Sequence, residues 1–345
     1  MLAIRATWKK LGVAAVALFI EALHASAAGV AILGTTTTAM ANDPVCNIRL
    51  SGPIGAGDSR KLESALDTVS QRSGNDLGSI DARITLCLNS PGGSYSEGLE
   101  IANSLLERHF RTMIEPNAIC YSACALIFMA GNWKFEGQYF SDRRLHVTGQ
   151  LGFHAPYIKG IPQQTYSALD LEGAYKESIR GIRNLMRLGQ KHRASDDFMP
   201  KTLIAAMLDK GPGEVFLIDT VYKAAKLNVV LYGARKASIT VTGLCNACTL
   251  FHYGTGSELS LDEPPANCTA SKESIERRAS QIWFGGFGSE GLGYCVAQVP
   301  SPYGGPFGVS RSIIWNKNSP PQGDEFYVPY NWYLYPAATN IQNLQ

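Results

Sequence analysis

An apolar strand that ends in a diglycine turn and continues into a helix is the feature that most restricts the fold of this chain. Residues 82–88 (ARITLCL) predict a buried strand, and residues 89–94 (NSPGGS) end it. From Tyr95 to about His109 the apolar side chains fall on one face at helical spacing. Residues 122–130, rich in alanine and methionine, predict a buried helix headed by Ser122. Strands that alternate with helices in this way indicate an α/β domain.

The same alternation continues on both sides of this stretch. Asp58 is placed to cap a helix that reaches about Arg72, with Leu62, Leu66 and Val69 on one face. The other expected elements are strands at Cys46–Leu50, Arg111–Ile114 and Val229–Leu231, strand pieces within Leu145–His154, and helices at Gln163 to about Leu188, Leu203–Leu208 and Tyr222–Leu227.

The composition changes after Lys236, where glycine, proline, tyrosine and tryptophan become frequent. Short strands are expected at Ala237–Thr242 and Gly293–Val299, between turn-rich stretches. We therefore expect an α/β domain over residues 42–236 and a small, cysteine-containing, mainly β module over residues 237–345. The end of this module, past Pro320, is expected to be loosely held.

The first 41 residues have the layout of an export signal. Basic residues precede the apolar run at 11–20 (LGVAAVALFI), and small residues suit cleavage after Ala27 or after Ala41. Retention as a membrane anchor is the alternative, but Glu21 and His24 interrupt the apolar span, and a charge near the bilayer centre costs about 2.5–3.5 kcal/mol. The sequence therefore predicts an exported protein, periplasmic or secreted.

The charge balance excludes one class of partner. The formal net charge is +2, and it arises entirely from the first 41 residues, which hold three basic side chains (Arg5, Lys9 and Lys10) and one acidic side chain (Glu21). The remaining chain is neutral, so it has no electrostatic basis for binding nucleic acid or an anionic membrane.

All eight cysteines follow the signal. An even number of cysteines in an exported chain predicts disulfides. The four between residues 245 and 295 have the composition of a zinc site, but their irregular spacing and an oxidising compartment favour two disulfides instead.

Three parts of the sequence supply what acyl transfer requires. The turn at Gly92 and Gly93 offers backbone N–H groups to an oxyanion. Ser122 offers a fixed hydroxyl, and His154, within residues 152–156 (GFHAP), offers a base.

Each of these features also has an ordinary structural interpretation. The diglycine is compatible with a simple turn, Ser122 with a helix N-cap, and His154 with a buried core histidine. Among the other histidines His146 is the nearest rival as a base, because His109 lies in charged helical surroundings.

The motifs at 89–94, 120–124 (CYSAC) and 152–156 together resemble those of the Clp-protease proteolytic subunit family, within the Clp/crotonase superfamily. They are most similar to the exported ClpP-like members of that family. The resemblance covers roughly residues 46–232. The three motifs in this order are specific to the family, although none of them is specific on its own. It implies a fold of strand–strand–helix units wound as a spiral.

The resemblance also assigns roles to individual residues. It implies that Ser122 is the nucleophile and His154 the general base of a serine hydrolase. Gly92 and Gly93 match the oxyanion turn, and Ala123 matches the second oxyanion donor. No metal or cofactor is implied.

The chain departs from the family around the nucleophile. Ala118 stands where the family usually has glycine. Cys120 and Cys124 flank Ser122, as in the exported relatives, and their spacing allows a bridge to each other or to Cys46 or Cys87.

The third member of the expected triad has no clean match. Asp209 and Glu214 are the nearest carboxylates, with Asp209 taken as the candidate, and Asp219 lies farther along. A Ser–His dyad is therefore the alternative to a Ser–His–Asp triad.

The sequence as a whole predicts an exported serine peptidase-like hydrolase that acts on peptides or unfolded proteins. It carries no Walker-type Gly-x-x-x-x-Gly-Lys-Ser/Thr motif, so neither ATP nor an ATPase partner is expected. The family assembles into rings, which predicts a homo-oligomer. The alternatives are a non-catalytic protein of the same fold that binds a peptide or acyl ligand, and an ester or thioester hydrolase.

Overall fold

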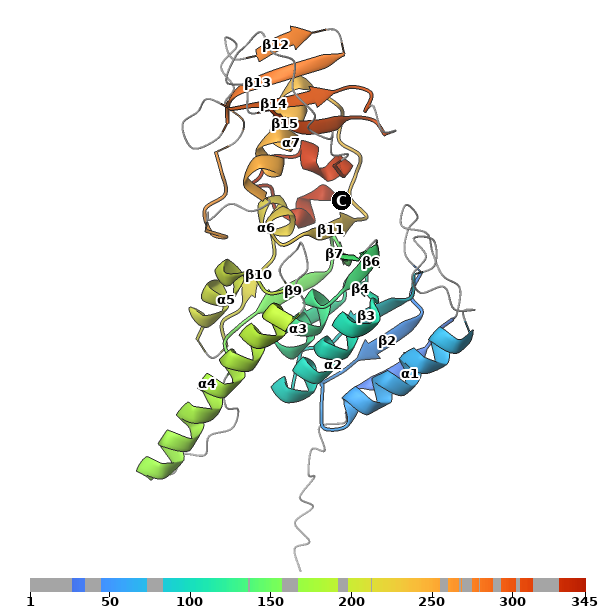
Figure 1. Cartoon of the computed structure of the whole chain (residues 1–345), viewed down its shortest axis with the longest axis vertical. Helices are drawn as coiled ribbons and strands as arrows, with labels where there is room; N and C mark the ends of the chain where they lie inside the picture. Colours follow the sequence, from blue (N-terminus) through green and yellow to red (C-terminus); the bar gives the residue numbers. More distant parts are fainter. Residues whose placement is uncertain are drawn as a thin grey trace, which may run out of the picture.

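The structure is a computed structural model of the 345-residue chain. It describes residues 27–34, 45–72, 83–135, 137–156, 167–191, 198–211, 213–254, 260–266, 268, 275–278, 280–287, 293–301, 305–312 and 329–345. An α/β domain forms one end of the molecule, and a smaller C-terminal module packs beside β11 at the edge of its sheet (Figure 1). Of the expected signal, residues 1–26 lie outside the described residues.

The centre of the α/β domain is a six-stranded sheet with the order β1-β2-β3-β4-β8-β11. Strands β2 to β11 of this sheet are parallel, and β1 is antiparallel to β2. The strands are β1 (Gly29–Ile32), β2 (Ile48–Ser51), β3 (Thr85–Asn89), β4 (Arg111–Ile114), β8 (Arg143–His146) and β11 (Val229–Tyr232). Parallel strands are covered on both faces, and Leu50, Leu86 and Leu145 are accordingly fully buried. The predicted α/β class is confirmed.

Smaller sheets complete the domain. A three-stranded sheet has the order β10-β9-β5, from β5 (Ile119–Tyr121), β9 (Gln150–Phe153) and β10 (Phe216–Leu217). A hairpin of β6 (Asn132–Phe135) and β7 (Gln138–Ser141), which we did not expect, follows the central helix.

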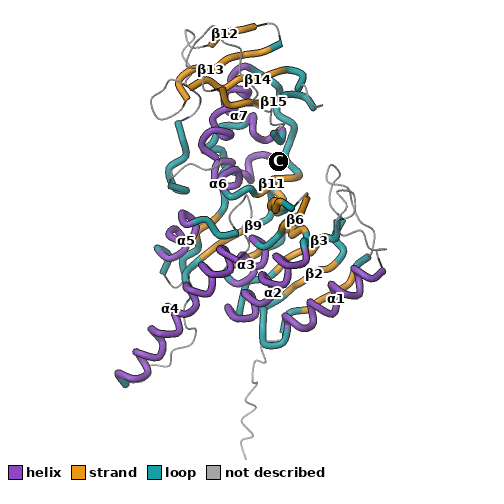
Figure 2. Tube along the Cα trace, in the orientation of Figure 1, coloured by secondary structure: helices purple, strands orange, loops and turns teal. Residues whose placement is uncertain are grey.

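The helices lie where the apolar periodicity predicted them. Helices α1 (Asp58–Arg72), α2 (Tyr95–Arg108) and α3 (Ala123–Met129) pack side by side in this order. Helix α4 (Ala168–Lys191) contacts α2 and extends away from the body of the domain (Figure 2). Helices α5 (Lys201–Leu208) and α6 (Val221–Lys226) follow. The prediction of a buried helix headed by Ser122 is confirmed, because every residue of α3 is buried.

One local arrangement recurs along the α/β domain: a strand of the large sheet, a short β contact, and a helix. It is seen in β4–β5–α3 and in β8–β9–α4. After β2 and β3 the short contact is a single parallel bridge, from Ile54 to Gly93 and from Ser90 to Cys120. The segments that follow successive strands therefore lie beside one another, which brings the diglycine turn next to the start of α3.

The N-terminal boundary of the domain differs from the prediction. Residues 29–32 form β1 and pair with β2, so the sheet begins before residue 42, where we had placed the start of the domain. The Ala28 N–H donates to Asp58 Oδ2 over 2.8 Å in a buried contact. Burial alone would raise the pKa of this carboxyl, but hydrogen bonds from Gly55, Lys61 and Ala28 hold the pKa below its ordinary value.

The C-terminal module is also less purely β than expected. The predicted strand at Ala237–Thr242 is wrong: helix α7 (Val241–Gly254) begins there. Thr240 Oγ1 accepts the Gly243 N–H at 3.0 Å, and this capping bond starts a helix in a stretch whose β-branched residues favour a strand. The module also holds an antiparallel sheet in the order β12-β13-β14-β15, formed by β12 (Ile275–Arg278), β13 (Gln281–Phe287), β14 (Gly293–Gln298) and β15 (Gly308–Ser312).

The end of the chain is held firmly. Two short 3₁₀ helices, η2 (Asn331–Leu334) and η3 (Ile341–Leu344), bury Trp332 and Leu344. The N–H groups of Val221 and Tyr222 at the start of α6 donate to the tail, to Thr339 O at 3.0 Å and Ala337 O at 2.9 Å. The expectation of a loose C-terminus is therefore wrong for residues 331–345, and residues 313–328 lie outside the described part.

All eight cysteines form disulfides. The pairs are Cys46–Cys87, Cys120–Cys124, Cys245–Cys268 and Cys248–Cys295. The preference for two disulfides over a zinc site in the last third is confirmed. Within the described part of the chain, no helix combines the length and apolar character that crossing a bilayer requires.

The position of β1 separates the two predicted cleavage sites. Cleavage after Ala27 keeps β1 and leaves the new α-amino group of Ala28 at the Asp58 carboxylate. Cleavage after Ala41 removes β1 and Ala28, and with them the bond to Asp58. We expect a variant that starts at Ala28 to unfold at a temperature several degrees higher than one that starts at Asn42, because a hydrogen bond to a charged group contributes about 1.5–3 kcal/mol. Circular dichroism melts would measure this, and N-terminal sequencing of the exported protein should read from Ala28. Equal melting temperatures would contradict the prediction.

Candidate active site

Three of the residues that the sequence singled out, Gly93, Ser122 and His154, line a cavity of about 260 Å³. Its described lining consists of Pro91, Gly93, Tyr95, Ser122, Leu126, His154, Pro156 and Met207. Segments that are far apart in the chain thus converge: the turn after β3, the start of α3, the end of β9 and helix α5. The structure brings Ser122, His154 and Gly93 together in one pocket.

Ser122 occupies a sharp turn between strand β5 and helix α3. Its backbone has φ 57° and ψ −121°, a conformation that non-glycine residues rarely adopt. Such a residue costs on the order of 1–3 kcal/mol and persists only where its surroundings enforce it. Although Ser122 stands at the N-cap position, its hydroxyl does not cap the helix. The interpretation of Ser122 as an ordinary N-cap is therefore wrong, and its hydroxyl remains for another role.

The backbone N–H groups of Gly92 and Gly93 differ in their hydrogen bonding. The Gly92 N–H donates to Ser90 Oγ at 3.1 Å, so it is used inside the turn. The backbone around Gly93 pairs with Ile54, whose N–H donates to Gly92 O and whose O accepts the Ser94 N–H. Neither of these bonds uses the Gly93 N–H, and among the described residues no acceptor meets the N–H of Gly93 or of Ala123.

Gly92 also makes room for the turn at Ser122. A Cβ at residue 92 would lie 2.6 Å from Tyr121 O and 2.7 Å from Ser122 Cβ. Contacts this short do not occur between real atoms, and the φ of +92° favours glycine in any case. Of the three expected oxyanion residues, Gly93 and Ala123 have N–H groups that meet no acceptor among the described residues, and Gly92 allows the close approach.

His154 is oriented by the backbone. Its Nδ1 lies 2.8 Å from Ala155 O. A carbonyl oxygen can only accept a hydrogen bond, so Nδ1 carries the proton and Nε2 is the acceptor of the ring. The rival His146 pairs through Nδ1 with Thr148 Oγ1 at 2.8 Å and does not belong to the described lining of the pocket.

None of the candidate carboxylates belongs to the described lining. Asp209 is exposed just after α5, although Met207 from the same helix lines the pocket. Glu214 Oε2 accepts the Gly211 N–H at 2.9 Å, and Asp219 forms an ion pair with Lys223 at 2.9 Å. His154 Nδ1, the atom that the acid of a triad would contact, is paired with Ala155 O.

Sequence reasoning missed the apolar wall of the pocket. Tyr95, at the start of α2, donates from its hydroxyl to Gly181 O on α4 at 2.9 Å, and burial raises the pKa of Tyr95 to about 12. Its position two residues after the diglycine turn could have indicated a place in the site. Met207 carries no such signal, because its helix reaches the pocket only through tertiary packing.

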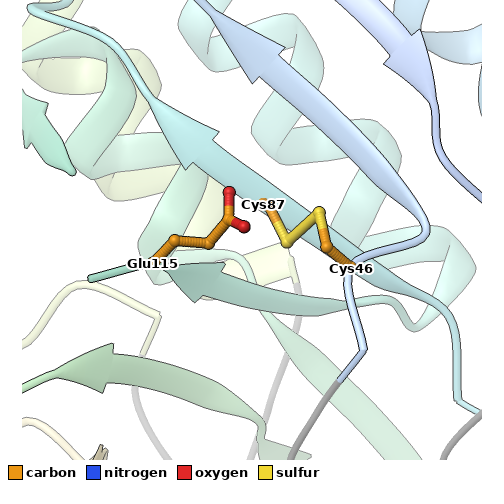
Figure 3. Close-up of side chains that lie close together, drawn as sticks. All are labelled: Cys46, Cys87 and Glu115. Carbon is orange, nitrogen blue, oxygen red and sulfur yellow. A yellow bond between two sulfur atoms is a disulfide. The ribbon is translucent and has the colours of Figure 1, made fainter. Parts of the chain in front are cut away.

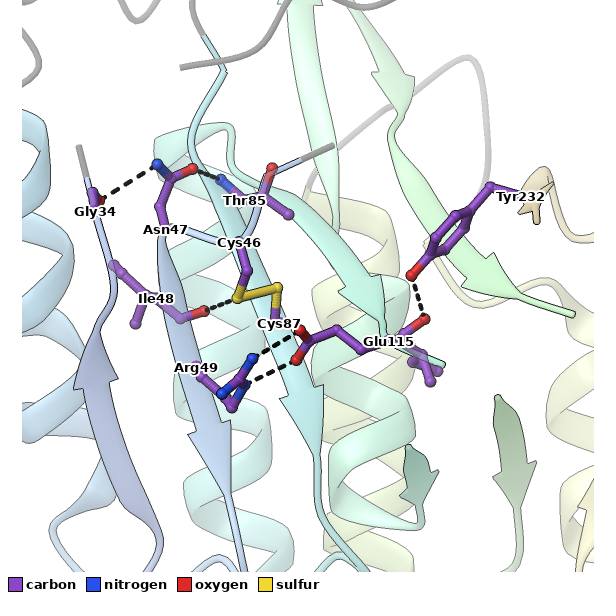
Figure 4. The surroundings of a disulfide bond; sticks show 10 residues. Gly34, Cys46, Asn47, Ile48, Arg49, Thr85, Cys87, Glu115 and Tyr232 are labelled. Carbon is purple, nitrogen blue, oxygen red and sulfur yellow. Dashed lines mark hydrogen bonds and ion pairs between the residues drawn. A yellow bond between two sulfur atoms is a disulfide. The ribbon is translucent and has the colours of Figure 1, made fainter. Parts of the chain in front are cut away.

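One group of described residues has the chemistry of metal ligands. Cys46, Cys87 and Glu115 lie together, with their ligand atoms within 4.8 Å of one another (Figure 3). The two cysteines are joined in a disulfide, however, and only a thiolate binds a metal ion strongly. Glu115 accepts two hydrogen bonds from Arg49, at 2.7 and 2.8 Å (Figure 4). This group is therefore structural in the oxidised protein.

Comparison with known proteins adds no relative: no protein-family model matches the chain, and a search of curated proteins finds no significant match.

The packing at Gly92 gives a direct test of the site. Gly52 provides a matched control, because it has a similar φ of +84° but nothing within 4 Å of an added Cβ. We expect Gly52→Ala to cost about 1 kcal/mol of stability and to leave the site intact. Gly92→Ala should displace Ser122 and lower its rate of reaction with a fluorophosphonate roughly 10- to 100-fold, as a misplaced reacting group does. Equal rates per folded molecule for the two variants would show that the contact does not position Ser122.

Proposed function

We propose that this protein is a serine hydrolase in which Ser122 attacks an acyl carbon and His154 is the base. The observation that carries the proposal is the strained strand–helix turn at Ser122, a residue whose hydroxyl does not cap the helix and which lines the same pocket as His154 and Gly93. Serine nucleophiles of hydrolases are held on turns of this kind. Strained backbone at a residue in a pocket is also more typical of a functional site than of a structural one.

We further propose that the α/β domain belongs to the Clp/crotonase superfamily and resembles the exported ClpP-like proteins. The recurring arrangement of a sheet strand, a short β contact and a helix supports this assignment. The order of the three motifs along the chain supports it as well.

The proposed reaction begins when His154 Nε2 accepts the proton of Ser122 Oγ. The serine oxygen then bonds to the carbonyl carbon of the substrate. The oxygen of that carbonyl becomes negative and accepts hydrogen bonds from the N–H groups of Gly93 and Ala123. The imidazolium returns its proton to the leaving group, and an acyl-serine remains. Water, deprotonated by His154, then attacks the acyl carbon. The bond from that carbon to Ser122 Oγ breaks, the acyl group leaves as an acid, and the imidazolium returns its proton to Ser122 Oγ.

The pocket wall indicates the kind of substrate. Pro91, Tyr95, Leu126, Pro156 and Met207 present mainly apolar surface beside Ser122. A cavity of about 260 Å³ suits one apolar side chain next to the bond that is cut, in a peptide or an unfolded protein. The hydrolysis requires no cofactor or metal, and no ATPase partner or nucleic acid is proposed.

Location and assembly follow from other features. Four disulfides support an exported protein, periplasmic or secreted. Helix α4 exposes several large apolar side chains, namely Leu169, Leu171, Tyr175, Ile179 and Met186. Exposed apolar surface of this kind is typical of an interface, and it supports self-association of the chain.

A second candidate function is a non-catalytic protein that binds a peptide or acyl group in the same pocket. The observation that favours it is the position of Asp209, Glu214 and Asp219, none of which belongs to the described lining. Binding without reaction would then use the N–H groups of Gly93 and Ala123 to hold a carbonyl or carboxylate.

Covalent labelling distinguishes the two candidates. We expect a fluorophosphonate to label the wild-type protein, Ser122→Ala to abolish the labelling, and His154→Ala to slow it roughly 10²- to 10⁴-fold, the usual contribution of a general base. Ser178→Ala, on the exposed face of α4, is the matched control and should react at the wild-type rate. Mass spectrometry of intact protein measures the reaction. A folded wild-type protein that is not labelled would support the binding protein instead.

The contact between Ala155 O and His154 Nδ1 predicts how the reaction responds to the loss of the Asp209 carboxylate. Because this oxygen already accepts the proton on His154 Nδ1, Asp209→Asn should change the labelling rate less than about 3-fold. In a true triad the corresponding change lowers the rate by about 10⁴. A loss of 100-fold or more in this variant, with an unchanged melting temperature, would show that Asp209 acts on His154.

A further inference from the structure

The proposed nucleophile lies inside a small disulfide loop. Cys120 is the middle residue of β5, and Cys124 is the second residue of α3. They are bonded to each other across a sequence separation of 4, with their Cα atoms 5.1 Å apart. Both side chains are fully buried. The bridge therefore joins the strand that leads into Ser122 directly to the helix that leaves it.

Hydrogen bonds hold the two sides of this turn unequally. On the strand side, the Tyr121 N–H donates to Ser90 O at 3.1 Å and the Ser122 N–H donates to Gly152 O at 3.0 Å. On the helix side, Ser122 O accepts the Leu126 N–H at 3.2 Å, which is a bond within the first helical turn. That bond ties Ser122 to its own helix and does not tie the helix to the sheet. Near its other end, α3 is tied to the large sheet by Thr112 Oγ1 of β4, which donates to Phe128 O at 2.7 Å. At the first turn of the helix, the disulfide supplies the link to β5.

The backbone at Ser122 needs such a restraint. A φ of 57° is unfavourable for serine, and the local chain would relax if the angle between β5 and α3 could change. Rotation about the Ser122 backbone would turn its hydroxyl away from the pocket. Close packing of Gly92 against Tyr121 O and Ser122 Cβ, and of Gly98 on α2 against Ala123, opposes this motion, but neither contact joins β5 covalently to α3.

We propose that the Cys120–Cys124 disulfide is a positioning element for the reaction: it fixes the turn at Ser122 and thereby the direction of the hydroxyl. The cysteines do not touch the substrate, and they act through the backbone that they enclose. This inference rests on the proposed hydrolase function and adds to it a requirement for the oxidised state of one particular cysteine pair.

The inference separates this disulfide from the others. Cys46–Cys87 joins the segment just before β2 to strand β3 (Figure 4). Neither cysteine belongs to the described lining of the pocket. Its removal should destabilise the same α/β domain without altering the turn at Ser122. It is therefore the matched control for the loss of a disulfide as such.

The test compares the saturation kinetics of fluorophosphonate labelling in three proteins: the wild type, Cys120→Val/Cys124→Ala and Cys46→Ala/Cys87→Ala. Valine keeps most of the buried volume at residue 120, and Cys120→Ala/Cys124→Ala serves as a second variant if packing of the valine prevents folding. Rates are normalised to folded protein, measured by circular dichroism well below each melting temperature.

We expect loss of Cys120–Cys124 to lower the maximal labelling rate roughly 10- to 100-fold, the effect of a misplaced reacting group. The concentration that gives half of that rate should change less than about 2-fold, since the pocket wall is intact. Loss of Cys46–Cys87 should leave both parameters near the wild-type values. If the disulfide served stability alone, its loss would lower the amount of folded protein. The maximal labelling rate and the half-saturating concentration of the folded molecules would both stay at their wild-type values.

The outcomes distinguish the inference from the function on which it rests. Wild-type labelling together with an unchanged maximal rate in the Cys120/Cys124 variants overturns the positioning role alone. An equal loss in both disulfide variants overturns it too, because the effect would then be general. A folded wild-type protein that does not react overturns the proposed function, and the inference with it.

Discussion

The close contact between the diglycine turn and the backbone of Ser122 is the constraint on which the candidate site depends. Tyr121 O and the Ser122 side chain occupy the space that a Cβ at residue 92 would need. Only glycine allows the turn after β3 to approach the turn between β5 and α3 this closely. The approach places Gly93 and Ser122 in the wall of the same pocket. A nucleophile and an oxyanion donor can cooperate only if they are that near to each other.

The recurring arrangement of strand, short contact and helix explains why these turns meet. Each helix returns the chain to the start of the next parallel strand. The segments that follow β2, β3 and β4 therefore all lie at the carboxyl ends of the strands. Glu97 of α2 reinforces this edge, since its carboxylate accepts the N–H groups of Gly57 and Ser59 at the start of α1, both at 2.8 Å. Those bonds lower the pKa of Glu97 below its ordinary value. The site is therefore built mainly from backbone groups that the scaffold fixes, and even His154 takes its orientation from a carbonyl.

Prediction from the sequence succeeded where a local pattern had a single interpretation. The periodic apolar face of α1, the buried run of α3 and the strand at Arg111–Ile114 were all placed within a residue or two. It failed where distant contacts decided the outcome. The stretch from Ala237 has β-branched residues that favour a strand, but a capping bond from Thr240 and the packing of Leu244 and Ala247 make it helical from Val241.

The amino-acid sequence by itself determined the α/β class, the order of the main strands and helices from β2 to α6, and the candidate residues Gly93, Ser122 and His154. These depend on hydrophobic periodicity and on the special chemistry of glycine, serine and histidine, which are local properties of the chain. Only the tertiary structure decided the partners: which cysteines bond, that β1 belongs to the sheet, that Ala155 O orients His154, and that Tyr95 and Met207 close the pocket. No local sequence pattern encodes these contacts, because each of them forms only after the helices and sheets have packed.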